Sequence, residues 1–377
     1  MRILFWSGTF WPQIGGVEVL TAAFLPTLRA RGYDYVVVTP KSFADLPDES
    51  YFKGIPVYRF PFQSSPSCGN LDHFITIRQK IALLKRSFVP DLVHINSVGV
   101  DSFFHLSTAN AHRAPLLVTL RGKWTTQTES IVKHILRDAD WVVACSSDLL
   151  GLARQLVPEI ASCSSVIWNG VKAPDLFPKP LPTDPPRLLC VGRLVADKRF
   201  NLALSAFASL HSRFPGMHLI IAGDGPERAE LERQAFQLGI RGSVDFLGWV
   251  APELVPALIN DATIIMMPSK HEAFPLVALQ ASLMARPVVA TKAGGLSEII
   301  IHGETGLLVE RDDFAALASA VALLLEHPHK AAQMGDAARK RALQTFTFER
   351  HVNAYETLYA EVVERWLARN ALSGLAV

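Results

Sequence analysis

The sequence predicts an α/β protein made of two doubly wound domains. Short β-branched runs alternate with longer amphipathic stretches along most of the 377 residues, and a proline-rich stretch interrupts this rhythm once before it restarts. Near-continuous apolar strands between helices are typical of a parallel sheet that is covered on both faces. The length also favours two domains of ordinary size over one.

The first predicted domain covers residues 1–172. Its strands are expected in seven apolar runs: RILFWS, YVVVTP, PVYRFP, DLVHINS, PLLVTLRG, DWVVACS and SVIWNGV. Residues 173–186, APDLFPKPLPTDPP, contain six prolines and are predicted to form a semi-rigid linker.

The second predicted domain covers residues 187–347. Its expected strands are RLLCVGR, HLIIAGDG, VDFLGWV, TIIMMPS, PVVATKAGG and TGLLV. Ligands bind such sheets outside the carboxyl ends of the strands, so we expect the two domains to face one another across a cleft. A long amphipathic helix from about residue 348 to 377 is expected to pack back on the first domain.

Composition excludes several classes of protein. The net charge of +2 gives no electrostatic case for nucleic-acid binding, and 49% hydrophobic with 19% charged residues is not the composition of a disordered chain. The four cysteines form no CxxC pair and no zinc pattern, which favours a reducing cytoplasm. No signal peptide and no run of about 18 apolar residues are visible.

The first candidate motif is SGTFWPQIGGVEVL, where Gly15 and Gly16 open a helix after a strand. Glycines at that point let backbone amides approach an anion at the positive end of the helix. A flexible strand–helix turn is an equally valid interpretation of this motif alone.

Two further motifs follow strands of the second domain. In CVGRLVADKRFN, Arg193 and Lys198 stand five residues apart, and two cations there suit a diphosphate, although a solvated basic loop is the alternative. In IIAGDGPERAEL, the sequence lacks GxGxxG, so Gly223 and Gly225 are interpreted as a tight turn and not as an NAD fingerprint.

The stretch HEAFPLVALQ, residues 271–280, combines a carboxylate, a proline and an amide. Pro275 suits the first turn of a helix, which we expect to continue to about Ala285. Glu272 would then lie in the loop before the helix, and Gln280 would be a pocket-facing polar group on a helix that is otherwise apolar.

Together these motifs resemble the retaining GT4 glycosyltransferases, which have the GT-B fold. GGVE, VGRL with a lysine five residues after the arginine, AGDGP, FLGWV, PSKHEAFPLVALQASLMARPVVATKAGGLSEII and HGETGLLV occur in one fixed order over nearly the whole chain. Each motif is weak singly, whereas the ordered set is specific.

The resemblance implies a donor site for a nucleotide sugar, UDP- or GDP-linked, in the second domain. Arg193 and Lys198 would bind the diphosphate and Glu272 the donor sugar, as the catalytic residues, with no metal and no other cofactor. Further donor contacts are implied at Gly16, Gly223, Trp249, Val250, Phe274, Pro275, Leu276, Val277 and Gln280. The acceptor would be a glycan or a lipid-linked sugar, in the synthesis of a cell-surface polysaccharide or glycolipid.

Three positions depart from the family pattern. The second glutamate of the Glu-x7-Glu motif is here Gln280, which loses a charge-assisted bond to the ribose that is about 1 kcal/mol stronger than a neutral one. Pro275 replaces a glycine and removes one amide donor. Arg121 stands where many members carry a histidine, and could meet an anionic acceptor.

One tempting metal motif is interpreted as structural. The letters DAD at residues 138–140 resemble a DxD, but they close a helix and lead into the strand WVVACS.

Two alternative functions remain open at this point, and so does the hypothesis of a membrane contact. A degenerate GT-B protein could bind nucleotide sugar or glycan without turnover, and a nucleotide-sugar epimerase could share the fold. A peripheral membrane contact is a further hypothesis, because residues 77–88 interleave Arg78, Lys80, Lys85 and Arg86 with apolar residues. The alternative interpretation is an ordinary helix that packs on the first sheet.

Overall fold

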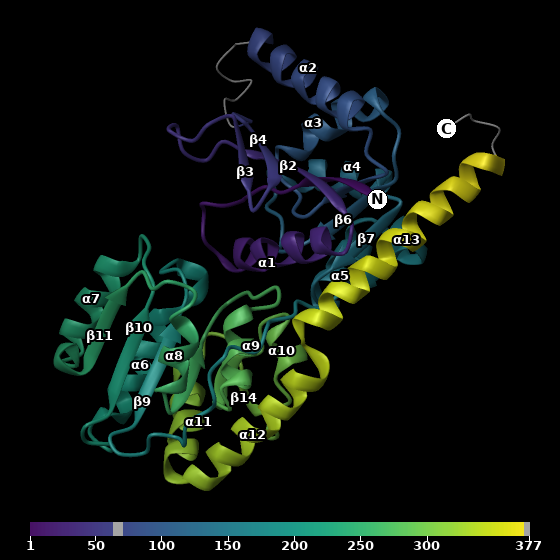
Figure 1. Ribbon diagram of the computed structural model, residues 1–377. Helices are drawn as coiled ribbons and strands as arrows, with labels where there is room; N and C mark the ends of the chain where they lie inside the picture. Colours follow the sequence, from purple (N-terminus) through teal and green to yellow (C-terminus); the bar gives the residue numbers. More distant parts are fainter. Residues whose placement is uncertain (63–70, 373–377) are drawn as a thin grey trace. The chain divides into compact units, whose positions relative to one another are not determined.

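The computed structural model describes residues 1–62 and 71–372 and divides the chain into two compact units (Figure 1). The first unit consists of Met1–Trp168 and His351–Val377, and the second of Asn169–Arg350. Each unit is an α/β structure built on its own sheet, as the sequence predicts.

The sheet of the first unit has eight strands in the order β3-β4-β2-β1-β5-β6-β7-β8. All neighbouring strands run parallel except β3 and β4, which form an antiparallel hairpin at one edge that the sequence patterns did not predict. The strands are β1 Arg2–Trp6, β2 Asp34–Pro40, β3 Glu49–Phe52, β4 Ile55–Phe60, β5 Leu92–Ile95, β6 Leu116–Leu120, β7 Trp141–Ala144 and β8 Ser164–Val166.

Helices connect these strands and begin where the local sequence permits. The helix after β7, for example, begins behind Ser146, whose hydroxyl accepts a hydrogen bond from the Leu149 amide at 3.3 Å and satisfies one of the orphan donors of the first turn. The helices are α1 Gly16–Ala30, α2 Leu71–Phe88, α3 Ser102–Ser107, η2 Ala109–Ala111, α4 Glu129–Asp138, α5 Ser147–Leu156, η3 Pro158–Cys163 and most of α13 Phe348–Leu372.

The sheet of the second unit is parallel throughout, with the order β11-β10-β9-β12-β13-β14. Its strands are β9 Arg187–Val191, β10 His218–Ala222, β11 Val244–Gly248, β12 Ile264–Met267, β13 Val288–Thr291 and β14 Gly306–Val309. Its helices are η4 Ala196–Lys198, α6 Phe200–His211, α7 Arg228–Gln237, η5 Arg241–Ser243, α8 Val255–Asn260, α9 Leu276–Leu283, α10 Leu296–Ile299, α11 Phe314–Glu326 and α12 Pro328–Thr345.

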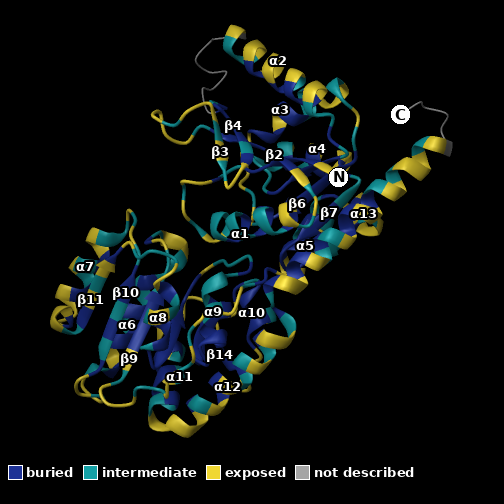
Figure 2. Cartoon of the chain, in the orientation of Figure 1, coloured by how far each residue is buried: buried dark blue, intermediate teal, exposed yellow. Residues whose placement is uncertain are grey.

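Most strands of the two sheets are buried on both faces, which Figure 2 shows as dark blue cores under teal and yellow helix surfaces, whereas β3 and β11 at the sheet edges keep exposed residues. In the second unit, Leu188 and Cys190 of β9 pack with residues of α6 and α11 in one apolar cluster. Because strand side chains alternate between faces, Leu189 is left to the opposite face, and it is fully buried as well. This burial explains why the strands appear in the sequence as continuous apolar runs.

The proline-rich residues 173–186 lie within the second unit and are bound to it. The Lys179 amide donates to Asn260 Oδ1 at 2.9 Å, and the guanidinium of Arg286 donates to the Lys179 carbonyl at 2.9 Å. Arg286 is almost fully buried, and burial lowers the pKa of its guanidinium to about 10. These contacts fix the segment on the surface of the unit.

Within the described residues, no helix combines the length and the apolar character that crossing a bilayer requires.

Candidate functional site

The candidate site of the second unit lies where the direction of strand addition reverses. From β9 the chain proceeds to β10 and β11 on one side, and to β12, β13 and β14 on the other, so β9 and β12 are neighbours at the switch point. Loops that leave the carboxyl ends of two such strands diverge and leave room for a ligand. Arg193 and Lys198 follow β9, and Glu272 follows β12.

The loop after β9 presents the two cations in different environments. Gly192, with φ +154°, turns the chain out of the strand, and η4 then carries Lys198. Arg193 is exposed, and its guanidinium makes no hydrogen bond or ion pair within residues 1–62 and 71–372. Lys198 is more enclosed, with 23% of its side chain exposed.

Lys198 and Glu272 contact each other directly, although 74 residues separate them in the chain. The ammonium of Lys198 donates to Glu272 Oε1, and Ser269 Oγ donates to the same oxygen at 2.8 Å. Only 8% of the Glu272 side chain is exposed. The structure therefore brings the predicted diphosphate cation and the predicted sugar carboxylate into one cluster.

Backbone contacts hold the two loops in this position. The Lys270 amide donates to the Asp197 carbonyl at 2.8 Å, which joins the loop after β12 to η4. Ser269 is buried, and its carbonyl accepts from Thr291 Oγ1 at 2.5 Å. Glu272 itself is tied through its carbonyl, which accepts from the Gly295 amide at 3.0 Å.

Gly223 lies in a second contact between loops, after β10. A β-carbon at this position would lie 1.8 Å from the Gly192 carbonyl oxygen, so no larger residue fits without moving the backbone. The Gly223 amide donates to the Gly248 carbonyl at 2.7 Å, which places the end of β11 against the same loop. Trp249 follows directly with 59% of its surface exposed, and Val250 is half-buried.

The segment of Phe274 to Gln280 forms the third wall of this edge. Phe274 is buried, packs edge-on against Phe346 and accepts from Asn169 Nδ2 at 3.0 Å through its carbonyl. The sequence predicted Pro275 in the first turn of the helix. In the structure it is the N-cap residue instead, because its ψ of 127° is extended and not helical. The helix α9 begins at Leu276 and ends at Leu283, two residues before the predicted end.

Leu276, Val277 and Gln280 of α9 are half-buried. The first amides of a helix have no partner within it, so the start of α9 offers donors beside Glu272. The side-chain amide of Gln280 makes no hydrogen bond to any residue that the structure describes. Its polarity is therefore not explained by the packing of α9.

Two predicted site residues lie in the first unit, at strand ends of its sheet. Gly16 is exposed at the start of α1. Arg121 follows β6 and is oriented by Asn96, whose Oδ1 accepts from Arg121 Nε at 3.0 Å and from a terminal guanidinium nitrogen at 2.9 Å. The guanidinium also lies 5.8 Å from the centre of the Tyr355 ring.

Tyr355 belongs to a buried polar network that binds α13 to the sheet. His94 of β5 bonds Tyr359 Oη at 2.7 Å and Thr119 Oγ1 at 2.8 Å, and Thr119 bonds Tyr355 Oη at 3.0 Å. Burial, with the charge of Arg121 in second place, lowers the pKa of His94 well below its usual value. A neutral histidine can both donate and accept, which this chain of bonds requires.

Asp140 of the DAD triplet has structural partners. The triplet closes α4 and precedes β7. Asp140 Oδ2 accepts from the Leu116 amide at 2.8 Å, and its other oxygen accepts from Arg369. Across the described residues, no group of three or more histidine, cysteine, aspartate or glutamate side chains is arranged to hold a metal ion.

Sequence reasoning missed Ser269 and misplaced Lys85. A serine two residues after the strand TIIMM and three residues before Glu272 is a signal that could have marked a partner of the carboxylate. Lys85, grouped with the exposed cations of residues 77–88, is instead buried, and its ammonium donates to the carbonyls of His105 and Thr108 at 3.2 Å.

Comparison with known proteins gives two family matches that together span most of the chain. Residues 14–173 match the family described as Glycosyltransferase Family 4, and residues 172–341 match Glycosyl transferases group 1. Glycogen synthase of Mycobacterium tuberculosis is 29% identical over 95% of this chain and 94% of its own length. A GDP-mannose-dependent α-(1-6)-phosphatidylinositol monomannoside mannosyltransferase of Mycolicibacterium smegmatis is 35% identical over 43% of this chain and 44% of its own.

Solved structures share the fold at lower identity. Sucrose-phosphate synthase of Thermosynechococcus elongatus superposes with a TM-score of 0.84 at 23% identity, over 97% of this chain and 99% of that one. Anabaena Alr3699/HepE, solved in complex with UDP and glucose, superposes with a TM-score of 0.76 at 23% identity, over 96% and 100% of the two chains. At these identities the likeness establishes the architecture of both units.

Proposed function

The chain belongs to the GT4 glycosyltransferases of GT-B fold, and from this membership we propose that it transfers a sugar from a nucleotide-sugar donor, with retention of configuration, to a glycan or lipid-linked acceptor. Relatives that act on GDP-mannose or were solved with UDP support a UDP- or GDP-linked donor. The product would belong to a polysaccharide or glycolipid.

The contact between Lys198 and Glu272 is the observation that carries the proposal. In a nucleotide sugar, the anomeric carbon is bonded directly to an oxygen of the distal phosphate. A cation for that phosphate and a carboxylate for the sugar hydroxyls must therefore lie within a few ångströms of each other. The sequence separates these two groups, and the fold places them side by side at the switch point of the sheet.

Binding of the donor would exchange the partners of this cluster. Lys198 would turn from Glu272 to the diphosphate, where exposed Arg193 supplies a second cation. Glu272, still held by Ser269, would then accept hydrogen bonds from the sugar. The remaining donor contacts are proposed at Gly16, Gly223, the backbone of Trp249 and Val250, the segment from Phe274 to Val277, and Gln280 for the ribose.

The reaction we propose breaks the bond between the anomeric carbon and the diphosphate and forms a bond from an acceptor oxygen on the same face of the sugar. The leaving phosphate takes the proton of the acceptor hydroxyl, so no separate base is required. Negative charge grows on the diphosphate as it leaves, and Arg193 and Lys198 stabilise it there. We propose that these cations do the work for which other transferases use a metal.

The acceptor is proposed to meet Arg121 of the first unit. Asn96 and Tyr355 fix the plane of its guanidinium, which suits it to an anionic group of the acceptor.

A cytoplasmic location, with peripheral contact to an anionic membrane through Arg78 and Arg86 of α2, remains a proposal. Lys85 is buried and takes no part in such a surface. Co-sedimentation with anionic vesicles tests the membrane contact, and a lack of salt-sensitive binding would contradict it.

Measurement of nucleotide release tests the function directly. With UDP- and GDP-sugars, a transferase releases nucleotide faster when an acceptor extract is present, a binding protein releases none, and an epimerase yields a new sugar. EDTA is expected to leave the rate nearly unchanged. Loss of activity in EDTA that manganese restores would contradict the proposed role of the two cations.

A further inference from the structure

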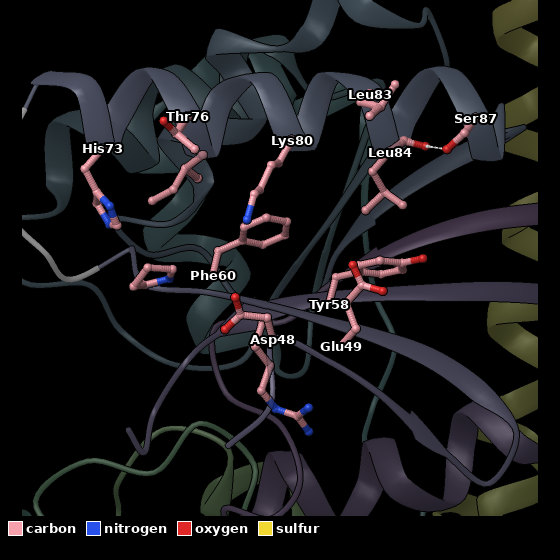
Figure 3. A pocket seen from close by; sticks show the side chains of 13 residues that line it. Asp48, Glu49, Tyr58, Phe60, His73, Thr76, Lys80, Leu83, Leu84 and Ser87 are labelled. Carbon is pink, nitrogen blue, oxygen red and sulfur yellow. Dashed lines mark hydrogen bonds between the residues drawn. The ribbon is translucent and has the colours of Figure 1, made fainter. Parts of the chain in front are cut away.

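A pocket in the first unit is lined by none of the residues assigned above to the donor or to the acceptor. It lies between α2 and the last residues of β4, beside the β3 edge of the sheet, and encloses about 440 Å³ (Figure 3). This volume lies within the range of small-molecule sites. Carboxyl ends of strands are the usual place for ligands in open α/β sheets.

The floor of the pocket is aromatic. Tyr58 and Phe60 are two residues apart on β4, so their side chains share one face of the strand, and that face is directed toward α2 (Figure 3). Ile77 and Leu84 of α2 supply aliphatic surface from the opposite wall. Rings and aliphatic groups of this kind bind a ligand that has an apolar face.

The charged groups of the pocket balance one another. Asp48 and Glu49 stand at the start of β3, and Lys80 of α2 points toward Asp48 across the opening (Figure 3). Asp48 already forms an ion pair with Lys41 at 2.8 Å. Arg59 is buried, and its guanidinium donates hydrogen bonds to Ser50 Oγ at 2.6 Å and to the Trp11 carbonyl at 3.0 Å. Glu49 and Lys80 form no ion pair with other described residues.

These features fit one class of ligand better than others. A free anion gains little, because the cations that line the pocket are offset by an equal number of carboxylates. An apolar ligand would leave Glu49 and Lys80 facing carbon. A neutral saccharide has C–H faces for Tyr58 and hydroxyl groups that can both donate to a carboxylate and accept from an ammonium.

We propose that this pocket binds a neutral sugar unit of the acceptor, at a distance from the hydroxyl that reacts. The proposal rests on the transferase function above and adds the chemical class of the acceptor to it. Tyr58 would pack against the face of the sugar, and Glu49 and Lys80 would hold its hydroxyls.

Saturation-transfer NMR on the full-length protein tests the proposal with methyl glycosides of glucose, galactose and mannose, their disaccharides, and inorganic phosphate as a separate probe. We expect binding of at least one saccharide, and Tyr58→Leu should weaken it about tenfold, the effect of losing one well-packed aromatic contact. Tyr51→Leu is the matched control, since Tyr51 lies on the same hairpin with 77% of its surface exposed and does not line the pocket. Glu49→Gln, a change at an exposed side chain, should weaken binding severalfold even if Tyr58→Leu folds poorly.

Three results would overturn the proposal: no saccharide binds, Tyr58→Leu and Glu49→Gln bind as the parent does, or phosphate binds in a way that Lys80→Gln abolishes. Thermal shifts with UDP- and GDP-sugars, measured on the same variants, keep this outcome separate from the proposed function. Donor binding that persists while saccharide binding fails rejects the pocket alone, whereas loss of donor binding in the parent protein rejects the transferase.

Discussion

The polar side chains of β5 and β6 in the first unit and those that follow β9 and β12 in the second are used in opposite ways. In the second unit, the charged groups that follow β9 and β12 contact each other yet stay within reach of a ligand, and Arg193 is exposed beside them. In the first unit, polar side chains on β5 and β6 are fully buried and bonded to tyrosines of α13. Polarity near a strand end therefore marks a candidate site where the side chains keep accessible surface, and not where they are fully buried.

The difference has an energetic basis. A buried polar network must be satisfied in full, and removing one member leaves another without a partner. A ligand site instead carries groups whose best partner is the ligand, so their removal costs activity more than stability. The buried network of the first unit and the charged cluster of the second should thus respond to mutation in opposite senses, and the following predictions test that contrast from the largest effect to the smallest.

Removing either of the cations proposed to bind the diphosphate should have the largest effect on transfer. Arg193→Ala and Lys198→Ala are each expected to lower kcat/KM by about 100- to 1,000-fold, the usual effect of losing one group that stabilises developing charge. Arg193→Ala should unfold at the same temperature as the parent, and Lys198→Ala, which leaves the Glu272 carboxylate with Ser269 alone, should unfold at a somewhat lower temperature. Nucleotide release and thermal denaturation measure the two quantities.

Arg233→Ala is the matched control for that experiment, because Arg233 is an exposed arginine of the same unit whose one ion pair among residues 1–62 and 71–372 is with neighbouring Glu230 on α7. It should retain full activity. A variant of Arg193 or Lys198 that keeps more than half of the activity would assign these cations to an ordinary solvated loop.

Sequence patterns predicted the second unit better than the first for a physical reason. The strands β9, β12, β13 and β14 of the second unit are almost wholly buried, so their apolar runs are continuous and their loops begin at clear boundaries. The β3 strand of the first unit, by contrast, is short, lies at the edge and alternates exposed with half-buried residues, and no apolar run announces it. The pocket beside it was invisible for the same reason.

Contacts between distant loops also lay beyond sequence reasoning. The roles of Lys198 and Glu272 were inferred separately, but their contact depends on the adjacency of β9 and β12, which the order of elements along the chain does not specify. The same holds for Lys85, where helical periodicity alone could not distinguish a buried lysine that bonds carbonyls from an exposed one.

The Ser269 hydroxyl should matter for turnover through Glu272. Glu272→Ala is expected to lower kcat about 100-fold, since the bonds proposed between this carboxylate and the sugar would strengthen toward the transition state. Ser269→Ala, which removes one bond to that carboxylate, should lower kcat about tenfold, equivalent to about 1.5 kcal/mol.

Ser282→Ala separates this positioning role from a loss of stability. Ser282 is a buried serine of α9 whose hydroxyl bonds the Ala278 carbonyl at 2.9 Å and does not contact Glu272. Both serine variants should lose about 1 kcal/mol of stability, and only Ser269→Ala should lose turnover. Equal activities of the two variants would remove Ser269 from the site.

In the first unit, buried Lys85 should make stability depend on pH. Burial lowers the pKa of its ammonium to about 7 in the folded protein, against 10.5 for an ordinary lysine. Between these values the unfolded chain binds more protons than the folded one, so the free energy of unfolding should rise with pH, by about 2 kcal/mol between pH 7 and 9. His105 contacts Lys85, and burial lowers the pKa of its imidazole well below the usual value, so it does not reverse this rise in stability. Burial raises the pKa of Asp101 to about 6, so that carboxyl group titrates below pH 7.

Hydrogen exchange of α2 and α3, measured between pH 7 and 9 and corrected for intrinsic rates, reports this stability locally. Lys85→Met should abolish the rise with pH, and Lys340→Met, a change at an exposed lysine of the second unit, should leave it intact. A slope that persists in Lys85→Met would assign the pH dependence to another group.

The smallest effect is expected at Gln280, where the two interpretations of a polar residue on an apolar helix differ most clearly. Its amide has no partner among the described residues, unlike the buried polar groups of the first unit, so it is available to the ribose of the donor. Gln280→Ala should raise the donor KM about fivefold and leave kcat unchanged, because ribose contacts are the same in the ground and transition states and are worth about 1 kcal/mol. Gln280→Glu, which adds the charge that the family usually carries, should fold normally and keep or lower the KM. If Gln280→Ala instead leaves the KM unchanged and lowers the melting temperature by several degrees, Gln280 is part of the core, and the donor site of the second unit ends at Glu272.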